Sequence, residues 1–230
     1  MKDTILEVKN LTVELDREKI ICNLSFKVKE GDTITILGPN GAGKTVLLKT
    51  LLGIFPYRGE IKWKEGIKVG YVPQRLPFIK TLPMSVKEFF KLKEEREKEI
   101  KKILNSIGFS DDFLNKKIAN LSSGQFQRIL VGFALLKNPE VLLFDEPMSG
   151  IDISGQESIY KLLERLKKEK NLTILLVTHD LSVVFKFSNY VICLNKCPIC
   201  QGSPKEILTL ENLQKLYGQE LRFYQHYHQH

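Results

Sequence analysis

The feature that most constrains this 230-residue chain is a glycine-rich octapeptide between an apolar strand and a helix. The apolar run 34–37 precedes it, and a helical pattern over 45–54 follows it. It matches G-x-x-x-x-G-K-[ST] at every position, with the residues Gly38, Pro39, Asn40, Gly41, Ala42, Gly43, Lys44 and Thr45. Strand, loop and helix in this order predict backbone N–H groups that surround a phosphate at a helix N-terminus.

Two side chains of this loop have separate predicted roles. Lys44 is expected to reach the β- and γ-phosphates of a nucleotide. The Thr45 hydroxyl is expected to bind Mg²⁺, which takes few protein ligands and keeps several waters. The alternative is a glycine-rich turn with an incidental lysine, and the flanking strand and helix disfavour it.

Strand and helix patterns alternate along the chain, which predicts a single α/β domain over 1–230 with a parallel core sheet. The expected strands cover 5–8, 24–28, 33–37, 59–63, 69–72, 141–144, 173–177 and 190–194, and helices are expected over 45–54 and 156–168 and from about 122. The stretch 76–137 interrupts this pattern and is interpreted as an inserted helical subdomain. Within it, a capping box at Ser85 opens a helix that leads into the charged run 91–102, which is expected to be a solvated helix face. Residues 219–230 are expected to form a flexible tail.

Composition allows several partners without choosing one. The chain has 35 basic and 27 acidic residues, a formal charge of +8, which suits nucleic acid, an anionic membrane, nucleotide phosphates or simply a solvated basic surface. The sequence has no apolar stretch near the roughly 20 residues that span a bilayer. The first five residues lack a signal-peptide pattern, so we expect the protein to stay in the compartment where it is made.

The cysteines and histidines leave two metal questions open. The four cysteines are not expected to form a disulfide framework, and Cys22 and Cys193 are expected to be buried. Cys197 and Cys200 have metal-ligand spacing but supply only two thiolates of a four-ligand zinc site, and a turn or edge strand fits them equally. The alternating His226, His228 and His230 could bind zinc weakly, or belong to a frayed end or to a segment added for expression.

Carboxylates follow a short buried strand later in the chain. The apolar run 141–144 ends in Asp145 and Glu146, at the edge where α/β folds bind ligands. Asp145 is predicted to help hold Mg²⁺, and Glu146 to polarise the water that attacks the γ-phosphate. An acidic turn is the alternative. A second such strand, 174–177, leads to His179, which could donate to a γ-phosphate oxygen.

A further motif narrows the family. Leu121, Ser122, Ser123, Gly124 and Gln125 begin a predicted helix and resemble the LSGGQ signature of the ABC (ATP-binding cassette) ATPases. The other family motifs follow in order, since Gln74 resembles the Q-loop glutamine, 149–152 the D-loop, and His179 the switch histidine. The resemblance extends over about residues 4–218.

This resemblance implies a P-loop NTPase fold of the ABC type, with an N-terminal antiparallel β subdomain beside the mostly parallel sheet. It also implies ATP and Mg²⁺ as cofactors and a head-to-tail homodimer, or another paired cassette, in the ATP-bound state. Ser122, Ser123, Gly124 and Gln125 would then complete the nucleotide site of the partner cassette. Gln74 would lie at the hinge of the insertion, sense the γ-phosphate with His179, and serve as a further Mg²⁺ ligand.

The sequence departs from the family pattern at two positions. Ser123 stands where the second signature residue is normally glycine. Leu15 stands where the family usually has an aromatic residue that stacks on adenine, so we expect an aliphatic contact with the base and less stacking.

Among ABC proteins, a transporter subunit is the leading interpretation. The chain would act from the cytoplasmic face of the cell membrane as a peripheral subunit, with separate integral membrane permease subunits and a solute-binding protein. Local similarity at 72–75, 82–86, 194–195, 202–208 and 213–218 resembles cassettes for zinc or manganese import. The alternatives are import of another small solute, or a non-transport ABC ATPase acting on DNA or the ribosome. Proteins of the latter class usually carry a long coiled-coil insertion or two cassettes in one chain. This sequence has neither feature, so no nucleic-acid partner is expected.

Overall fold

The computed structural model describes residues 2–74, 83–146 and 151–218. The chain divides into two compact units. The first joins Met1–Gly66 to Thr173–His230, and the second is Ile67–Leu172. The expected tail and the three tail histidines lie outside the described residues.

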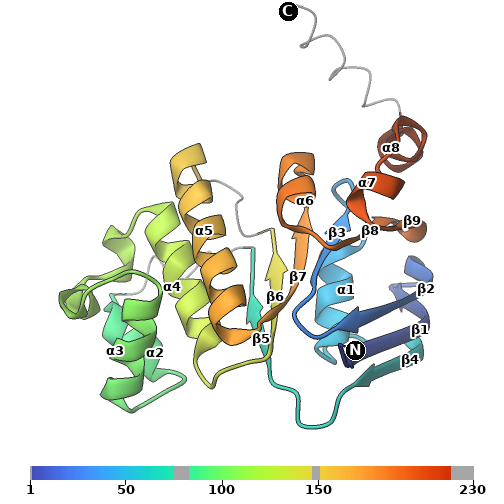
Figure 1. The fold of residues 1–230 in the computed structure, drawn as a ribbon. Helices are drawn as coiled ribbons and strands as arrows, with labels where there is room; N and C mark the ends of the chain where they lie inside the picture. Colours follow the sequence, from blue (N-terminus) through green and yellow to red (C-terminus); the bar gives the residue numbers. More distant parts are fainter. Residues whose placement is uncertain (1, 75–82, 147–150, 219–230) are drawn as a thin grey trace, which may run out of the picture. The chain divides into compact units, whose positions relative to one another are not determined.

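An antiparallel sheet forms one part of the first unit (Figure 1). Its strands in spatial order are β2 (Glu18–Lys29), β1 (Thr4–Leu15) and β4 (Arg58–Trp63). Asp16 and Arg17 join the first two strands with φ angles of 49° and 66°, as a tight hairpin turn requires. β1 and β2 are longer than the sequence predicts, because each continues pairing through bulges where the hydrophobic alternation is broken.

The first unit also carries parallel strands. Their spatial order is β7 (Thr173–Thr178), β3 (Thr33–Leu37), β8 (Tyr190–Asn195) and β9 (Cys197–Gly202), the last antiparallel to β8. Every residue of β3 is buried, as expected for an apolar strand covered on both faces. The helices of this unit are α1 (Lys44–Leu51), α6 (Leu181–Phe187), α7 (Pro204–Ile207) and α8 (Leu210–Tyr217).

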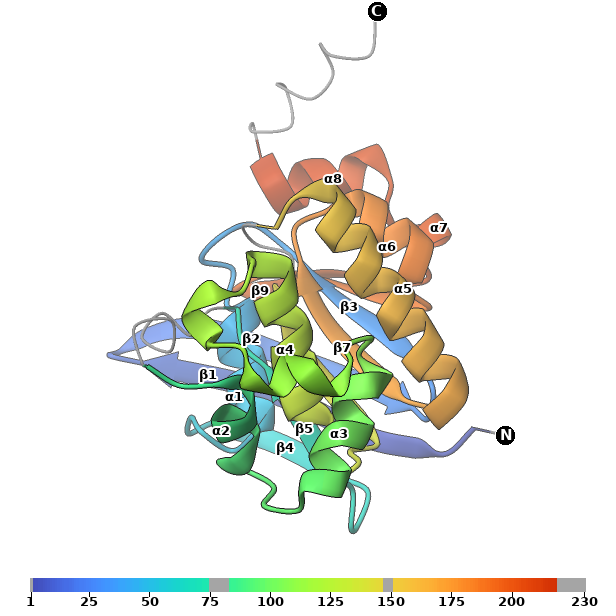
Figure 2. The ribbon, with the colours of Figure 1, turned by 90° about the vertical axis from the view of Figure 1, so that its left-hand side faces the viewer.

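The second unit is mainly helical. Its two strands, β5 (Val69–Val72) and β6 (Val141–Asp145), pair in parallel. Its α-helices are α2 (Val86–Lys91), α3 (Glu97–Ser106), α4 (Ser123–Leu135) and α5 (Ile153–Lys170), with short 3₁₀ turns at Asp111–Asn115 and Ile118–Asn120. α4 packs against α3 on one side and α5 on the other, as the turned view shows (Figure 2). The α/β fold with mostly parallel pairing is therefore confirmed.

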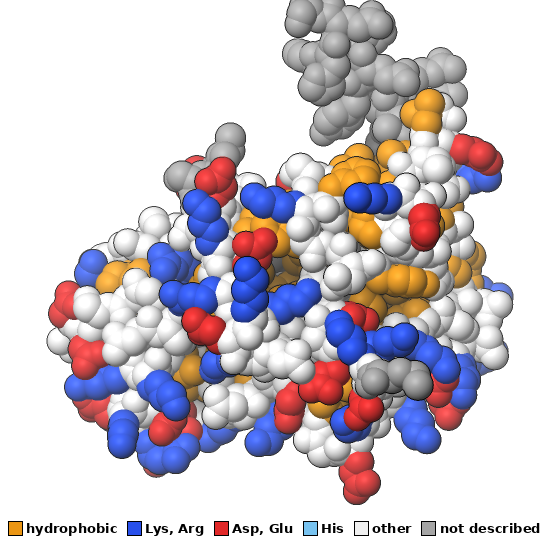
Figure 3. Space-filling model, in the orientation of Figure 1, with side chains coloured by type: hydrophobic (Ala, Val, Ile, Leu, Met, Phe, Trp, Pro, Cys, Tyr) orange, Lys and Arg blue, Asp and Glu red, His pale blue; other side chains and the backbone are white. Residues whose placement is uncertain are grey.

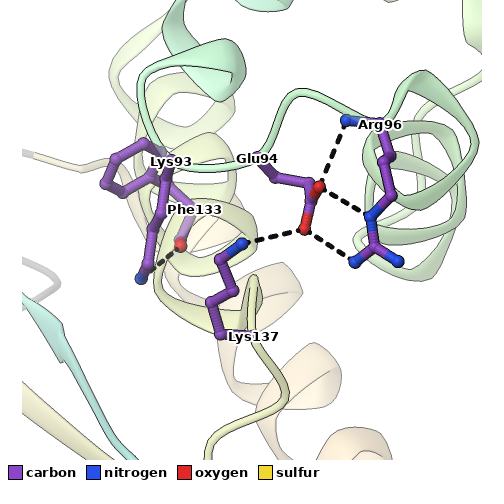
Figure 4. A network of polar contacts seen from close by, with 5 residues as sticks. All are labelled: Lys93, Glu94, Arg96, Phe133 and Lys137. Carbon is purple, nitrogen blue, oxygen red and sulfur yellow. Dashed lines mark hydrogen bonds and ion pairs between the residues drawn. The ribbon is translucent and has the colours of Figure 1, made fainter.

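The prediction that the charged run 91–102 is a solvated helix face holds only in part, because Glu97–Ser106 is helical and largely exposed in this run, whereas 92–96 is not helical. The chain leaves helical structure between α2 and α3, and Glu94 there is only 5% exposed. The Glu94 carboxylate accepts hydrogen bonds from the Arg96 backbone N, its guanidinium, and Lys137 Nζ at 2.9–3.1 Å (Figure 4). These donors, the Arg96 side chain first, hold the pKa of Glu94 well below its usual range.

The Lys93 side chain points away from Glu94, and its Nζ donates to the Phe133 carbonyl at 3.0 Å. Burial lowers the pKa of Lys93. A cavity of about 240 Å³ lies beside Glu94, between one side of α3 and the C-terminal ends of α4 and α5. The charge of the Glu94 carboxylate is already paired with Arg96 and Lys137 of the same chain. We therefore assign this cluster a structural role.

Elsewhere on the second unit the charged helices behave as expected. Lys and Arg side chains stand among Asp and Glu side chains over α2 and α3 (Figure 3). Lys87 and Lys101, for example, both pair with Glu97. The face is therefore mixed in charge rather than a single basic patch.

Candidate functional site

The glycine-rich loop follows β3 and ends at α1, as the sequence predicts. Lys44 is the first residue of α1 and only 5% exposed. Its Nζ donates to the carbonyl oxygens of Gly38 and Pro39, both at 2.8 Å. The loop thus holds a lysine ammonium at its centre by its own backbone, while Thr45 beside it is half-buried.

Two glycines of the loop have left-handed backbone conformations. Gly43 is the N-cap of α1 with φ 93°, and a Cβ there would lie 2.8 Å from the Ile20 carbonyl oxygen. Gly41 has φ 78° and open space where a Cβ would be. No side chain caps α1, and its first turn has no acidic residue. The N-terminus of α1 therefore carries the partial positive charge of the helix dipole and offers backbone N–H groups, a combination that fits a phosphate group.

The carboxyl ends of β5 and β6 bring together Gln74 and Glu146. Gln74 Nε2 donates to Glu146 Oε2 at 2.9 Å. Parallel pairing explains this contact, because Val72 is in register with Phe144 and the chain continues past both in the same direction. Glu146 has φ 44°, unusual for a residue with a side chain and frequent at functional sites.

Asp145 is buried, at 2% exposed, at the end of β6. Its Oδ2 accepts a hydrogen bond from the Tyr71 hydroxyl at 3.1 Å. Burial, and then the charge of Asp145, raises the pKa of Tyr71, which keeps the phenol a donor. Sequence reasoning did not assign Tyr71 a role. Its position three residues before Gln74 on a strand paired with β6 is the signal that could have found it.

The signature residues begin α4 in the same unit. Ser122 Oγ accepts from Gln125 N at 3.2 Å, and Gln125 Oε1 accepts from Ser122 N at 3.1 Å. This reciprocal pair is a capping box, so Ser122 and Gln125 already serve their own helix. Ser123 is exposed, and Gly124 is half-buried near Ile151.

The remaining predicted positions are distributed between the two units. His179 follows β7 in the first unit and is exposed, and Asp180 after it caps α6 by accepting from Ser182 N. Leu15 ends β1 and is half-buried opposite Glu18. In the predicted D-loop, 149–150 lie outside the described residues. The phosphate loop, His179 and Leu15 therefore share one unit, and Gln74, both carboxylates and the signature share the other.

The expectation that the cysteines form no disulfides is wrong. Cys22 is bonded to Cys197, and Cys193 to Cys200. The physical reason is topological: β9 pairs with β8 at the edge of one sheet and also contacts β2 of the other sheet, which brings together residues that are 175 positions apart. Cys193 is buried as predicted, whereas Cys22 is only half-buried.

The cysteine pairing also bears on the CxxC metal interpretation. Cys197 and Cys200 each bond to a different partner, and β9 is the edge strand that the sequence allowed as an alternative. In the part of the chain that the structure describes, no three His, Cys, Asp or Glu side chains gather to hold a metal ion. A nucleotide-bound Mg²⁺ needs no such cluster, because phosphates and water supply most of its ligands.

Comparisons with known proteins identify the family of the chain. The ABC transporter family matches residues 21–149. A zinc import ATP-binding protein ZnuC of Buchnera aphidicola subsp. Schizaphis graminum is 40% identical, covering 98% of this chain and 97% of that protein. A protein of the same name from Magnetococcus marinus is 38% identical, covering 98% and 89%.

A solved structure shares the fold. The chain of cbiO1 from Clostridium perfringens, part of the ABC transporter complex cbiONQ, superposes with a TM-score of 0.78 at 26% identity, covering 98% of both chains. Within residues 2–74, 83–146 and 151–218, no helix has the length and apolar character needed to cross a bilayer.

Proposed function

This chain belongs to the ABC transporter family as an ATP-binding ATP hydrolase, and from that premise we propose that it powers import of a metal ion, zinc or manganese. The observation that supports the choice of cargo is the 40% identity to a zinc import ATP-binding protein over 98% of the chain. Metal is here the cargo of the transporter, and this subunit need not touch it.

In this proposal the phosphate loop binds the phosphates of ATP. Lys44 exchanges its bonds to the Gly38 and Pro39 carbonyls for phosphate oxygens, a shift between acceptors that a flexible side chain can make. Thr45 supplies a hydroxyl to Mg²⁺. Mg²⁺ when bound neutralises charge on the phosphates.

The carboxylates of the second unit have distinct tasks in the proposal. Asp145 is oriented by the hydrogen bond from the Tyr71 hydroxyl, and would help position Mg²⁺. Glu146 would accept the proton of the attacking water as general base. Gln74, hydrogen-bonded to Glu146, would sense the γ-phosphate together with His179, and is a further candidate Mg²⁺ ligand.

The proposed assembly contains two copies of the chain or a paired cassette. The signature residues Ser122, Ser123, Gly124 and Gln125 would complete the partner's nucleotide site. Integral membrane permease subunits would form the translocation path, with the cassettes bound peripherally at the cytoplasmic face of the membrane. A solute-binding protein would deliver the cargo.

Glu146→Gln tests the proposed chemistry. Removing a general base is expected to lower the ATPase rate by about 10²- to 10⁴-fold while MgATP still binds, because the amide preserves shape but cannot take a proton. Glu140→Gln is the matched control: this exposed carboxylate accepts from Lys68 N in the same unit and has no proposed role. An unchanged rate in Glu146→Gln, measured by phosphate release, would remove Glu146 from the mechanism.

Transport by the complex with its permease, reconstituted in vesicles, tests the cargo. ATP-dependent uptake of zinc or manganese, absent with Glu146→Gln, is expected. Uptake of another small solute without either metal would refute the metal assignment but keep the transporter. ATPase activity stimulated by DNA or ribosomes, with no permease partner, would refute both.

A further inference from the structure

The hairpin of β8 and β9 lies against the phosphate loop. Its turn residue Lys196 has φ 58° and donates its backbone N–H to the Ala42 carbonyl at 3.0 Å. One strand of the same hairpin reaches the start of the loop, since a Cβ on Gly38 would lie 2.0 Å from the Leu194 carbonyl oxygen. The position of this hairpin therefore bears directly on the backbone that surrounds the phosphate.

Strand β2 holds the same turn from its other side. Cys22 N donates to the Lys196 carbonyl at 3.0 Å, and Lys196 Nζ pairs with Glu18 Oε1 at 2.6 Å. Two residues before Cys22, the Ile20 backbone and side chain approach Gly43. β2, the hairpin turn and the loop thus form one continuous chain of backbone contacts.

A disulfide bond joins two of the elements that make these contacts. The Cys22–Cys197 disulfide ties β2 to the residue after Lys196, with a Cα–Cα distance of 4.8 Å. It closes a loop of 175 residues in sequence, so it restricts arrangements that the hydrogen bonds alone would permit.

The second disulfide differs in its surroundings. Cys193 is fully buried in a cluster with Leu37, Val184 and Leu216, and Cys200 packs against that cluster. Cys197 is exposed and Cys22 is half-buried. Reactivity of cysteines toward thiol and disulfide reagents depends on access, so the Cys22–Cys197 pair should respond first.

We propose that Cys22 and Cys197 form a thiol–disulfide control site that adjusts nucleotide binding at the phosphate loop. The inference rests on the proposed binding of MgATP at Gly38–Thr45. A low-molecular-weight disulfide such as oxidised glutathione is the oxidant. The oxidised pair holds the Lys196 turn, and through it the Ala42 carbonyl, in the arrangement seen here.

The exchange is balanced in atoms and electrons. One cysteine thiolate attacks a sulfur of the small disulfide and expels one small thiolate, which takes up a proton, leaving a mixed disulfide. The other cysteine, as thiolate, attacks the protein-side sulfur and expels the second small thiol. Two cysteine thiols are oxidised to Cys22–Cys197, and one small disulfide is reduced to two thiols.

The test uses the full chain in two states, reduced with dithiothreitol or treated with oxidised glutathione. The affinity for a fluorescent trinitrophenyl-ATP with Mg²⁺ is measured in each, and the Cys22–Cys197 peptide is identified by mass spectrometry. Because the disulfide pre-organises the loop, the oxidised chain is expected to bind about 3- to 10-fold more tightly than the reduced chain.

Matched variants separate the two disulfides. Cys22→Ser should bind like the reduced wild type in both states, whereas Cys200→Ser should keep the response. Equal affinities of oxidised and reduced wild type, absence of the linked peptide, or loss of the response in Cys200→Ser alone would overturn the inference. Failure of wild type to bind nucleotide in either state would instead overturn the proposed phosphate site itself.

Discussion

The two helix N-termini to which the proposed function assigns phosphate, those of α1 and α4, are built in opposite ways. α1 begins at Gly43, which has no side chain, and Lys44 supplies a cation. α4 begins at Ser122 with a complete capping box to Gln125 and no charged residue at its start. The N-terminus of α1 therefore has no side-chain cap that an anion must displace, whereas the N-terminus of α4 already has hydrogen-bond partners within its own chain.

This difference suggests unequal contributions to nucleotide binding. The α1 start carries a cation and a helix dipole, and both attract phosphate before any partner arrives. The α4 start offers only neutral groups, and a phosphate there must share donors that now serve the cap. We therefore expect α1 to determine affinity in the single chain, and α4 to matter only once two chains close on the nucleotide.

The largest expected effect removes the cation from α1. Lys44→Met, which keeps the length of the buried side chain, should weaken MgATP binding about 100-fold, corresponding to about 3 kcal/mol of charge-assisted hydrogen bonding. Lys49→Met in the last turn of α1 is the control and should bind normally. Affinity by isothermal titration calorimetry decides this, and equal affinities for both variants would end the distinction between the two starts.

A charge at the other start should affect turnover without affecting the fold. Ser122→Asp keeps an N-cap acceptor of equal quality, so the melting temperature should hardly change. The added carboxylate would oppose a partner's phosphate, and the ATPase rate should fall on the order of 10- to 100-fold. Nucleotide affinity of the dilute single chain should stay at the wild-type value. A loss of that affinity would show that Ser122 acts on its own chain's nucleotide.

The contribution of the α4 N-cap to stability and activity can be compared with that of a second capping box in the chain. Ser85 caps α2 with Glu88 in the same reciprocal way that Ser122 caps α4. Ser122→Ala and Ser85→Ala should each lower the free energy of unfolding by about 1 kcal/mol. Only Ser122→Ala should reduce ATPase activity. Equal activity of the two variants in a phosphate-release assay would make the α4 cap purely structural.

The smallest expected effect concerns the base. If α1 recognises phosphate and Leu15 gives adenine only an aliphatic contact, ATP and GTP should bind within about tenfold of each other, because the stacking that is absent is worth about 0.5–1.5 kcal/mol. Competition of each nucleotide against one fluorescent probe measures the ratio. A much stronger preference for ATP would mean that another aromatic ring stacks on the base.

Local patterns predicted the parts of the molecule that local physics determines. The strand, glycine loop and helix around Lys44 lie within 20 consecutive residues, and the predicted capping box at Ser85 spans four. At Ser122 the helix start was predicted, whereas its reciprocal bond with Gln125 was not. The apolar run before Asp145 had to be a buried strand, because it is too short for a helix.

Long-range partners were beyond these patterns. The contact of Cys22 with Cys197 depends on β9 folding back beside β2, and nothing near either cysteine in the sequence indicates it. Glu94 bonds first to Arg96, two positions away, but its other partner, Lys137, is 43 positions away and no local pattern indicates it. The Tyr71 hydroxyl finds Asp145 only through the parallel pairing of β5 with β6.

The most direct test of the account mixes two defective chains. Lys44→Met lacks the α1 site but has an intact α4 start, and Ser122→Asp has the reverse. In a head-to-tail dimer, one of each restores a single intact site. An equal mixture should recover about a quarter of the wild-type ATPase rate, because about half of randomly formed dimers are mixed and each has one intact site of two. A mixture that shows only the mean of the two separate rates would contradict the claim that α1 binds the nucleotide and the α4 start of another chain completes its site.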